Sequence, residues 1–286
     1  MILRKDGDKI VAIVAKSLSG RQKAFLSRRM AAHIHWFSLT SPEVREISAD
    51  LSDGDSTGLG VYRFSTSPNV GVAITDTYFF TRRGYAFDHA FAKDNAVDWN
   101  ERSDRIVWRG SPNGHGLLSV DPVNLDTPGV RQRLRMAHVC KSTDIDFRFV
   151  TGGSQAFTTR LSEAGMIGDG IPPTDWANMK FGIDIDGTTN AWDNFMQRLI
   201  FGCCIFKVES QFSFYQWYYH RLTPWEHFIP VKADLSDLRE AVDWARCHPD
   251  RAREIAAAGQ AFARSMTTET ETRAAIEIIE RHEASK

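Results

Sequence analysis

The chain has 286 residues, 42% of them hydrophobic and 25% charged, so it can bury enough apolar surface to offset the entropy of ordering a globular fold. Lysine and arginine number 35 against 36 aspartate and glutamate, and this balance argues against a nucleic-acid-binding protein. No stretch approaches the roughly 18 uninterrupted apolar residues of a membrane span and no secretory signal pattern opens the chain, so we predict a cytoplasmic protein.

Short strands and one helix are predicted in the first third of the chain. Apolar runs bounded by turn residues favour strands over 9–16 and 69–76, and helical spacing favours a helix over 21–37. Residues 1–30 carry eight basic and two acidic side chains, a net charge of plus six. This segment is a candidate for peripheral contact with an anionic acceptor or with the inner membrane face, and a solvated basic surface is the plainer alternative.

Strands alternate with helices after the polar segment NERSD at 100–104. The pattern predicts strands over 105–110, 144–150, 180–187, 203–210 and 227–234, and helices near 126–139, 190–201, 236–247, 249–265 and 267–286. Such alternation favours an α/β fold with a parallel sheet and right-handed crossovers. The length of the chain favours two domains, which we place at 1–103 and 104–265, followed by a C-terminal helix at 266–286.

The turn after the strand at 105–110 is the first candidate binding site, because ligands of open α/β sheets bind beyond the carboxyl ends of the strands. Gly110 and Gly114 allow a ligand to approach the backbone closely. Ser111 and Asn113 supply short hydrogen-bond donors, and Arg109 can reach a phosphate. The alternative is a structural turn in which Arg109 forms an ordinary salt bridge.

A second turn follows the strand at 180–187. Gly187 breaks this strand, and Thr188, Thr189 or Asn190 is expected to cap the next helix, leaving its first amides for a diphosphate.

The strand at 203–210 delivers Glu209 and Ser210 to the same edge of the sheet. A carboxylate there can accept hydrogen bonds from ribose hydroxyls, and a helix or loop cap is the alternative. Asp184 and Asp186 lie on one face of their strand, as ligands of a hard cation would, but acid pairs beside a buried isoleucine are common at strand ends. We therefore predict no metal site.

Other reactive side chains favour structural roles. His227 lies in a rigid turn between prolines, next to aromatic residues, where packing is a more frequent role than catalysis. The four cysteines lack metal-ligand spacing, and we interpret them as reduced core thiols: Cys140, Cys203, Cys204 and Cys247.

Two motifs resemble glycosyltransferase family 90, which includes capsule-associated and lipopolysaccharide-modifying transferases and the protein O-glucosyltransferases. They are WRGS at 108–111 and PWEHFIPVKADLS at 224–236, and the segment LIFGCCIFKVES at 199–210 lies between them. The resemblance extends from about residue 104 to about residue 265, and only short pieces match before it.

The resemblance implies a GT-B architecture, in which two Rossmann-like domains face each other across a cleft and the C-terminal one holds a UDP-sugar. It implies an inverting transferase, without a metal or other cofactor, that moves a hexose or pentose to a glycan or lipid-linked acceptor of the lipopolysaccharide or capsule type. The turn at 109–114 would then hold the nucleotide diphosphate. Asp76, at the end of the predicted strand at 69–76, resembles the family's catalytic base, with a loop or cap acid as the alternative.

Two positions depart from the family pattern. Pro112 stands where relatives have a second arginine, and the segment 192–194, WDN, stands where a diphosphate arginine is expected. Arg198 or Arg109 is the candidate substitute. These departures keep open a non-catalytic protein of the same fold, acting as a partner subunit or glycan-binding module, and a fold relative that uses another nucleotide such as GDP.

Overall fold

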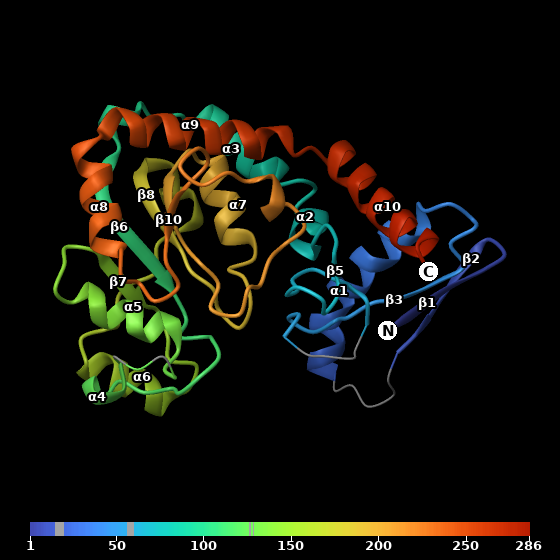
Figure 1. Cartoon of the computed structure of the whole chain (residues 1–286), viewed down its shortest axis with the longest axis horizontal. Helices are drawn as coiled ribbons and strands as arrows, with labels where there is room; N and C mark the ends of the chain where they lie inside the picture. The colour runs from blue at the N-terminus through green and yellow to red at the C-terminus, as the bar shows by residue number, and fades with distance from the viewer. Residues whose placement is uncertain (15–19, 56–59, 126, 128) are drawn as a thin grey trace. The chain divides into compact units, whose positions relative to one another are not determined.

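The computed structural model describes residues 1–14, 20–55, 60–125, 127 and 129–286. The chain forms two compact units that interleave along the sequence (Figure 1). The first unit comprises Met1–Ala86, Phe212–Arg221 and Met266–Lys286, and the second comprises Phe87–Gln211 and Leu222–Ser265. The polar segment at 100–104 therefore lies inside the second unit, and the C-terminal helix belongs to the first.

Among its described residues, the first unit combines two small sheets with three α-helices and one short 3₁₀ helix. An antiparallel sheet has the order β2-β1-β3, and a parallel pair joins β4 to β5. The elements are β1 (Ile2–Asp6), β2 (Lys9–Ile13), β3 (Glu46–Ser48), β4 (Tyr62–Arg63), β5 (Val72–Ala73), α1 (Gly20–Ser38), α2 (Thr77–Thr81), the short helix Tyr219–Arg221 and α10 (Thr268–Ala284). The strand predicted at 69–76 is reduced to two residues, and the end of the strand predicted at 9–16 lies outside the described residues.

The last helix is tied to the rest of the first unit by a buried acid. Glu271 is 0% exposed and accepts hydrogen bonds from Trp217 Nε1 and from two guanidinium nitrogens of Arg221. Its own backbone carbonyl accepts from Thr75 Oγ1 at 3.0 Å. The stretches that contain Thr75 and residues 217–221 therefore both contact α10.

Several basic side chains near the N-terminus are engaged within the first unit. Arg4 pairs with Glu46, and Lys5 Nζ donates to the carbonyls of Thr40 and Ser41. Arg29 is buried and pairs with an aspartate, Asp53. Lys16 lies outside the described residues, and of Arg21 and Lys23 the structure describes the backbone alone. These pairings reduce the positive charge that the segment presents to solvent.

The second unit is built on a five-stranded parallel sheet of order β10-β9-β8-β6-β7. The strands are β6 (Ser103–Gly110), β7 (Asp146–Phe149), β8 (Met179–Asp184), β9 (Cys204–Val208) and β10 (Ile229–Val231). All five lie within or next to the predicted ranges, so the mixed α/β fold with a parallel sheet is confirmed.

Helices follow most of these strands, as the alternation in the sequence predicts. They are α3 (Ala86–Asp94), α4 (Pro122–Leu125), α5 (Gln132–Cys140), α6 (Gln155–Glu163), α7 (Asp193–Ile200), α8 (Leu238–Cys247) and α9 (Pro249–Ser265), with short 3₁₀ turns at Trp99–Glu101 and Pro173–Asn178. The sequence did not predict α3, α4 or α6. The helix α6 is largely polar and buries only Phe157 and Leu161, one turn apart, so its periodic signal is weak.

Alternating strand residues form the core of the second unit. Trp108 of β6, Phe147 of β7 and Phe206 of β9 enter one cluster with buried residues of α5, α6 and α8. The opposite face of the sheet is covered by α7, which makes contacts with β8 and β9. Burial on both faces explains why the central strands β8 and β9 are mainly apolar in the sequence, whereas the edge strand β7 alternates buried phenylalanines with Asp146 and Arg148.

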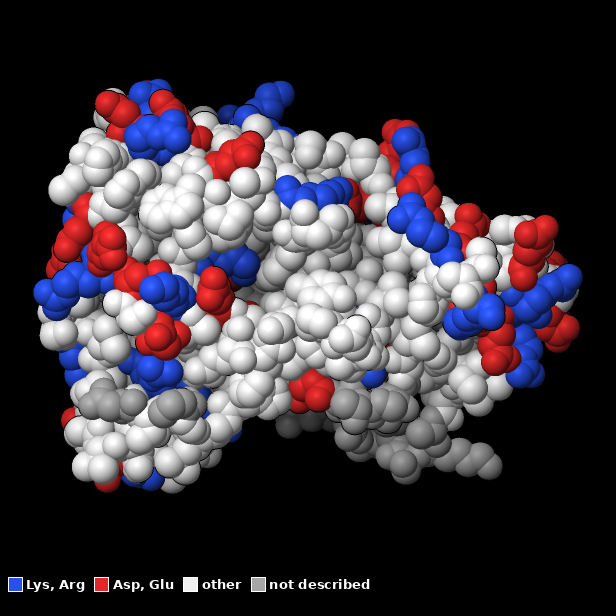
Figure 2. All heavy atoms as spheres, viewed as in Figure 1, with Lys and Arg blue, Asp and Glu red and all other residues white. Residues whose placement is uncertain are grey.

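Three of the four cysteines are buried and all are reduced. Cys247 is the exception to the prediction of core thiols, because it is exposed at the end of α8, where the amphipathic helix turns its polar side outward. Within the described residues, none of the helices has the length and apolar character needed to cross a bilayer. Acidic and basic side chains are interspersed on the face of the molecule seen in Figure 2.

Candidate functional site

The strand order creates one topological switch point in the parallel sheet. From β6 the chain moves to β7 on one side, and the next strand, β8, pairs with β6 on its other side. In doubly wound sheets of this order, ligands bind outside the carboxyl ends of the two strands that flank the switch point. The loops that follow β6 and β8 are therefore the candidate site, and they contain both turns selected from the sequence.

Arg133, in the first turn of α5, joins these two loops. Its Nη1 donates to the carbonyl of Ser111 at 3.0 Å, and its Nη2 donates to the carbonyl of Ile185 at 2.9 Å. The guanidinium also lies over the Trp108 ring, with Cζ 5.1 Å from the ring centroid. Arg133 is 7% exposed, so one buried cation holds the β6 and β8 loops in a fixed relation.

A second buried arginine reaches β8 from α7. Arg198 Nη1 donates to the carbonyl of Ile183 at 3.1 Å, and its Cζ lies 4.1 Å from the centroid of the Trp176 ring. Arg198 is 3% exposed. Arg198, which the sequence offered as the cation to neutralise the charge of a diphosphate, is therefore buried, and its hydrogen bond and its stacking contact support β8.

Two aspartates at the end of β8 face buried surroundings. Asp184 is 0% exposed and accepts from Lys207 Nζ at 2.6 Å, while its Oδ1 has no hydrogen-bond partner among the described residues. Burial raises the pKa of Asp186 to about 6, although Lys207 nearby and hydrogen bonds from Ser210 and Asn190 act to lower it. The edge therefore holds one carboxyl group that changes charge in the physiological range.

The raised pKa of Asp186 predicts that stability falls as the pH rises. An aspartate in an unfolded chain titrates near ~3.9, whereas the folded value is about 6. The folded state binds the proton of Asp186 more tightly than the unfolded state does, so protonation of Asp186 stabilises the fold. This stabilisation is complete below about pH 4 and is lost as the pH rises through about 6. Relative to Asp186→Asn, we expect the unmodified protein to lose ~2 to 3 kcal/mol of unfolding free energy between pH 4 and pH 7, measured by urea denaturation.

The control for this pH dependence is Asp243→Asn, which removes an exposed aspartate from α8. This variant should keep the pH dependence of the unmodified protein. Parallel stability curves for Asp186→Asn and the unmodified protein would contradict the prediction.

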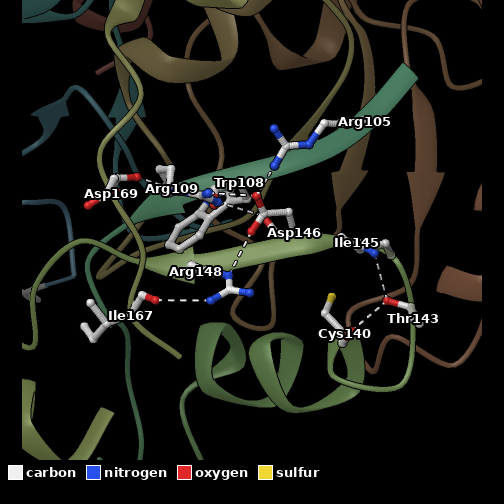
Figure 3. Close-up of polar contacts among 10 residues, drawn as sticks. All are labelled: Arg105, Trp108, Arg109, Cys140, Thr143, Ile145, Asp146, Arg148, Ile167 and Asp169. Atoms are coloured by element: carbon white, nitrogen blue, oxygen red, sulfur yellow. Dashed lines mark hydrogen bonds and ion pairs between the residues drawn. The ribbon is translucent and has the colours of Figure 1, made fainter. Parts of the chain in front are cut away.

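Arg109, the cation predicted for the first turn, lies in an ion-pair network between β6 and β7. Figure 3 shows Arg105, Arg109 and Arg148 around one carboxylate, Asp146. Arg109 Nη2 contacts Asp146 Oδ2 at 2.8 Å, and its Nε donates to the carbonyl of Asp169 at 2.8 Å. Burial alone would raise the pKa of Asp146, but the three guanidinium groups lower it. Arg109 therefore forms a salt bridge within the protein, as the alternative interpretation of this turn expected.

The backbone of the first turn lies against the β8 loop. A Cβ atom added at Gly114 would lie 3.5 Å from both Arg131 Cβ and the carbonyl oxygen of Gly187. At Gly110 an added Cβ would lie 2.6 Å from the Trp108 ring, so that glycine makes room for the protein's own indole. Of the two polar residues predicted here, Asn113 is exposed and Ser111 is half-buried.

The helix after β8 begins later than the sequence predicted. Its N-cap residue is Trp192, with φ 54° and no side-chain cap, so the expected capping by Thr188, Thr189 or Asn190 is wrong. Thr189 and Asn190 are buried, and Asn190 Nδ2 donates to Asp186 Oδ1 at 3.3 Å. That amide is committed to the aspartate, and the left-handed backbone of Trp192 marks the residue at which the helix begins.

Glu209 and Ser210 lie directly after β9, at the carboxyl edge of the sheet. The Glu209 backbone N–H donates to the Val231 carbonyl at 2.8 Å, and its carbonyl accepts from Gln132 Nε2 at 3.0 Å. The Glu209 side chain is exposed, whereas Ser210 is half-buried beside Asp186. The carboxylate that the sequence assigned to a ribose therefore reaches solvent at this edge.

Asp76, the candidate base, belongs to the first unit and is 1% exposed. It is the N-cap of α2, where Oδ1 accepts from the Phe79 N–H at 2.7 Å, and Oδ2 accepts from Gln216 Nε2 at 2.9 Å. This geometry agrees with the alternative interpretation, in which Asp76 caps a helix. The role as base remains a prediction.

Sequence reasoning missed two arginines at the start of α5. Arg133 is described above, and Arg131 is half-buried, donating from Nη1 to the Pro112 carbonyl at 2.8 Å and from Nε to the Gly116 carbonyl at 3.4 Å. The available signal was the run VRQRLR, which places arginines in the first helical turn after a glycine-rich loop. Its alternation of arginine with other residues gave no indication of which guanidinium is buried.

The remaining predictions concern a metal and His227. Within the described ranges, no three His, Cys, Asp or Glu side chains form a group that could hold a metal ion. His227 Nδ1 accepts from the Thr223 N–H at 2.9 Å, which stabilises the turn before β10. Its position supports the structural interpretation.

Parts of the chain are similar to known proteins. Protein O-glucosyltransferase 2 of Danio rerio is 41% identical over 92 residues, which are 32% of this chain and 18% of that protein. Protein O-glucosyltransferase 3 of Homo sapiens is 34% identical over 92 residues, again 32% of this chain and 18% of the relative. Uncharacterized protein 179R of Invertebrate iridescent virus 6 is 29% identical over 189 residues, 58% of this chain and 15% of that protein. The chain thus spans less than a fifth of these curated relatives.

Solved structures with partial similarity include Anabaena HepE in complex with UDP-glucose, with a TM-score of 0.40 and 10% identity over 68% of this chain and 53% of the other. A glycosyltransferase from Rickettsia africae has a TM-score of 0.41 and 10% identity over 94% of this chain and 84% of the other. A family model described as glycosyl transferase family 90 matches residues 85–272, well over half of the chain. This match confirms the resemblance seen in the two motifs: the chain belongs to glycosyltransferase family 90.

Proposed function

We propose that the protein is an inverting, metal-independent glycosyltransferase that moves a sugar from a UDP-sugar to a glycan or lipid-linked acceptor of the lipopolysaccharide or capsule type. The observation that carries the proposal is the family match, which includes the whole parallel sheet and the switch point between β6 and β8. The curated relatives named as O-glucosyltransferases support sugar transfer. The proposal includes a GT-B architecture, with the second unit as the donor domain.

The diphosphate of the donor is proposed to lie over the loops after β6 and β8. Arg131 is the suitable cation there, because it is half-buried at the start of α5 and, among the described residues, it contacts loop carbonyls and no acid. It would take the place of the family arginines that Pro112 and Asn194 replace. Glu209, exposed at the next strand end, would accept hydrogen bonds from the ribose.

In the transfer step, a carboxylate removes the proton from an acceptor hydroxyl as its oxygen attacks the anomeric carbon, and UDP departs from the opposite face of the sugar. Asp76 is proposed as that carboxylate. The negative charge on the departing diphosphate would be stabilised by Arg131 and by backbone amides of the loops, in place of a metal ion.

Measuring UDP release from a panel of UDP-sugars tests the proposal. With a suitable glycan acceptor we expect acceptor-dependent UDP release, and calorimetric titration should detect UDP binding to the same preparation. Absence of binding to UDP, at concentrations where a control uridine-nucleotide-binding protein is saturated, would overturn the proposal. Binding of GDP in place of UDP would change the nucleotide while retaining the fold assignment.

A non-catalytic role is the second candidate, and the replacement of both family arginines favours it. In that case the protein would bind a nucleotide sugar or glycan as a partner subunit without transferring the sugar. UDP binding at micromolar concentration, without transfer to any acceptor of a broad glycan panel, would support this role over catalysis.

Removal of divalent metal is expected to leave transfer intact. The proposed cation for the diphosphate is a guanidinium, so the rate in excess EDTA should remain within about twofold of the rate with Mg²⁺. A metal-dependent glycosyltransferase assayed in parallel provides the control. A loss of more than tenfold that Mg²⁺ or Mn²⁺ restores would contradict metal independence.

A further inference from the structure

A cavity of about 470 Å³ lies in the second unit beside the edge strand β10. It is bounded by the loop before β10 and by residues of α8 and α9, and β9 separates β10 from β8 in the sheet. The charged and aromatic side chains that line it are Trp225, Lys232, Asp237, Glu240, Trp244 and Arg251. Its volume falls within the range of about 300 to 1,000 Å³ typical of small-molecule sites.

Two indoles, together with Pro230 and Ala241, form the apolar part of this cavity. Trp225 is 43% exposed, and its ring lies 4.8 Å from that of Trp244 at an interplanar angle of 72°. On α8, the Trp244 ring also stacks on His248, with centroids 5.0 Å apart. An exposed indole next to a second, partly buried indole offers a flat apolar surface for a ligand.

The loop that carries Trp225 holds the ring in a fixed position. Trp225 has a left-handed backbone, with φ 64°, and its N–H donates to the Phe228 carbonyl at 2.8 Å. His227 Nδ1 accepts from the Thr223 N–H, which closes the turn from the other side. A strained backbone that is stabilised on both sides preorganises an exposed side chain for binding.

The charges that line the cavity are balanced. Lys232 and Arg251 supply two positive groups, and Asp237 and Glu240 supply two negative ones. Arg251 also pairs with Glu254, whereas the Glu240 side chain has no hydrogen bond or ion pair among the described residues. An excess of one sign of charge would favour a ligand of the opposite charge. The balance of charges in this cavity favours a neutral ligand that carries both hydrogen-bond donors and acceptors.

We propose that this cavity is a second carbohydrate-binding site, which holds a neutral glycan by stacking a pyranose ring on Trp225. A pyranose has an apolar C–H face for the indole and a rim of hydroxyl groups that donate to Glu240 and Asp237 and accept from Lys232. The choice of a sugar as the ligand rests on the proposed function. Binding at this site requires neither the donor nucleotide nor Asp76.

Titration of the full chain with neutral tetrasaccharides of glucose, galactose and mannose, followed by ¹⁹F NMR of protein labelled with 5-fluorotryptophan, tests the inference. We expect one of them to shift the Trp225 resonance, identified by its absence in Trp225→Phe. The affinity should fall at least tenfold in Trp225→Ala and about threefold in Glu240→Gln, and it should stay within about threefold in Trp225→Phe.

The matched control is Phe87→Ala, which removes a 68% exposed aromatic ring that does not line the cavity. This variant should bind the tetrasaccharide as the unmodified protein does, and saturating UDP should not compete. Unchanged affinity in both Trp225→Ala and Glu240→Gln would overturn the inference, as would absence of binding by every tetrasaccharide at millimolar concentration or tighter binding of choline or a sulfated tetrasaccharide.

The proposed function can fail separately from this inference. Tetrasaccharide binding that depends on Trp225, in a protein that does not bind UDP, would support the glycan site and overturn the transferase. Sugar transfer from a UDP-sugar, by a protein whose Trp225→Ala variant retains full glycan affinity, would support the transferase and overturn the glycan site.

Discussion

Replacing Asp76 with asparagine is expected to lower the rate of sugar transfer about 10²- to 10⁴-fold while leaving UDP affinity within about twofold. A general base contributes to the rate by accepting the acceptor's proton in the transition state, and an amide does not accept that proton. Steady-state UDP release and calorimetric UDP binding, measured on the same preparation, separate the two quantities.

The capping role of Asp76 supplies the control for this experiment. Asparagine can accept the Phe79 N–H as aspartate does, whereas alanine removes the cap, which typically costs ~1 kcal/mol. If Asp76 is the base, Asp76→Asn and Asp76→Ala lose transfer to the same extent, although only the alanine variant loses the cap hydrogen bond from the Phe79 N–H. If Asp76 is a cap alone, Asp76→Asn retains transfer and the assignment as base is wrong.

Two neighbouring arginines of α5 are expected to respond differently to the same substitution. Arg133→Met should lower the free energy of unfolding by ~3 kcal/mol, because the variant leaves the buried carbonyl of Ile185 and the part-buried carbonyl of Ser111 without a charged donor. Arg131→Met should change the stability by less than ~1 kcal/mol, because its side chain is half-buried, and should lower UDP affinity about tenfold. Urea denaturation measures the first effect and UDP titration the second.

Arg135→Met is the matched control for this pair, since Arg135 lies on the same helix and donates to the Asp234 carbonyl, away from the two loops. It should change neither quantity appreciably. Full UDP affinity in Arg131→Met would exclude that guanidinium as the diphosphate cation. An unchanged unfolding free energy in Arg133→Met would refute the structural tie between the β6 and β8 loops.

The parallel sheet was predictable because its central strands, β8 and β9, are largely buried on both faces and are mainly apolar in the sequence, while the edge strand β7 alternates buried and more exposed residues. The strand predicted at 69–76 failed for a related reason: an apolar run alone does not supply a pairing partner, and only Val72–Ala73 pair in the structure. Helix α9 was predicted at its observed bounds because Pro249 marks its first turn.

The details of the candidate site were less accessible from the sequence. The same residue type forms a part-buried ion pair in Arg109 and a buried tie between loops in Arg133, and this difference depends on which acids and carbonyls the fold brings near each guanidinium. The helix start after β8 was misplaced because Asn190 binds Asp186, a contact between side chains that no local pattern specifies. Tertiary contacts therefore determine the role of each of these side chains, which the residue type alone does not specify.

The interleaving of the two units constrains the order in which they can form during synthesis on the ribosome. All segments of the second unit have been translated once Ser265 is made, whereas the first unit still lacks Met266–Lys286. Until that stretch emerges, Trp217 and Arg221 have no Glu271 to bind, and Tyr62 has no Glu283. The amino-terminal residues, though made first, therefore acquire their final partners last, and the nascent first unit depends on the late arrival of α10.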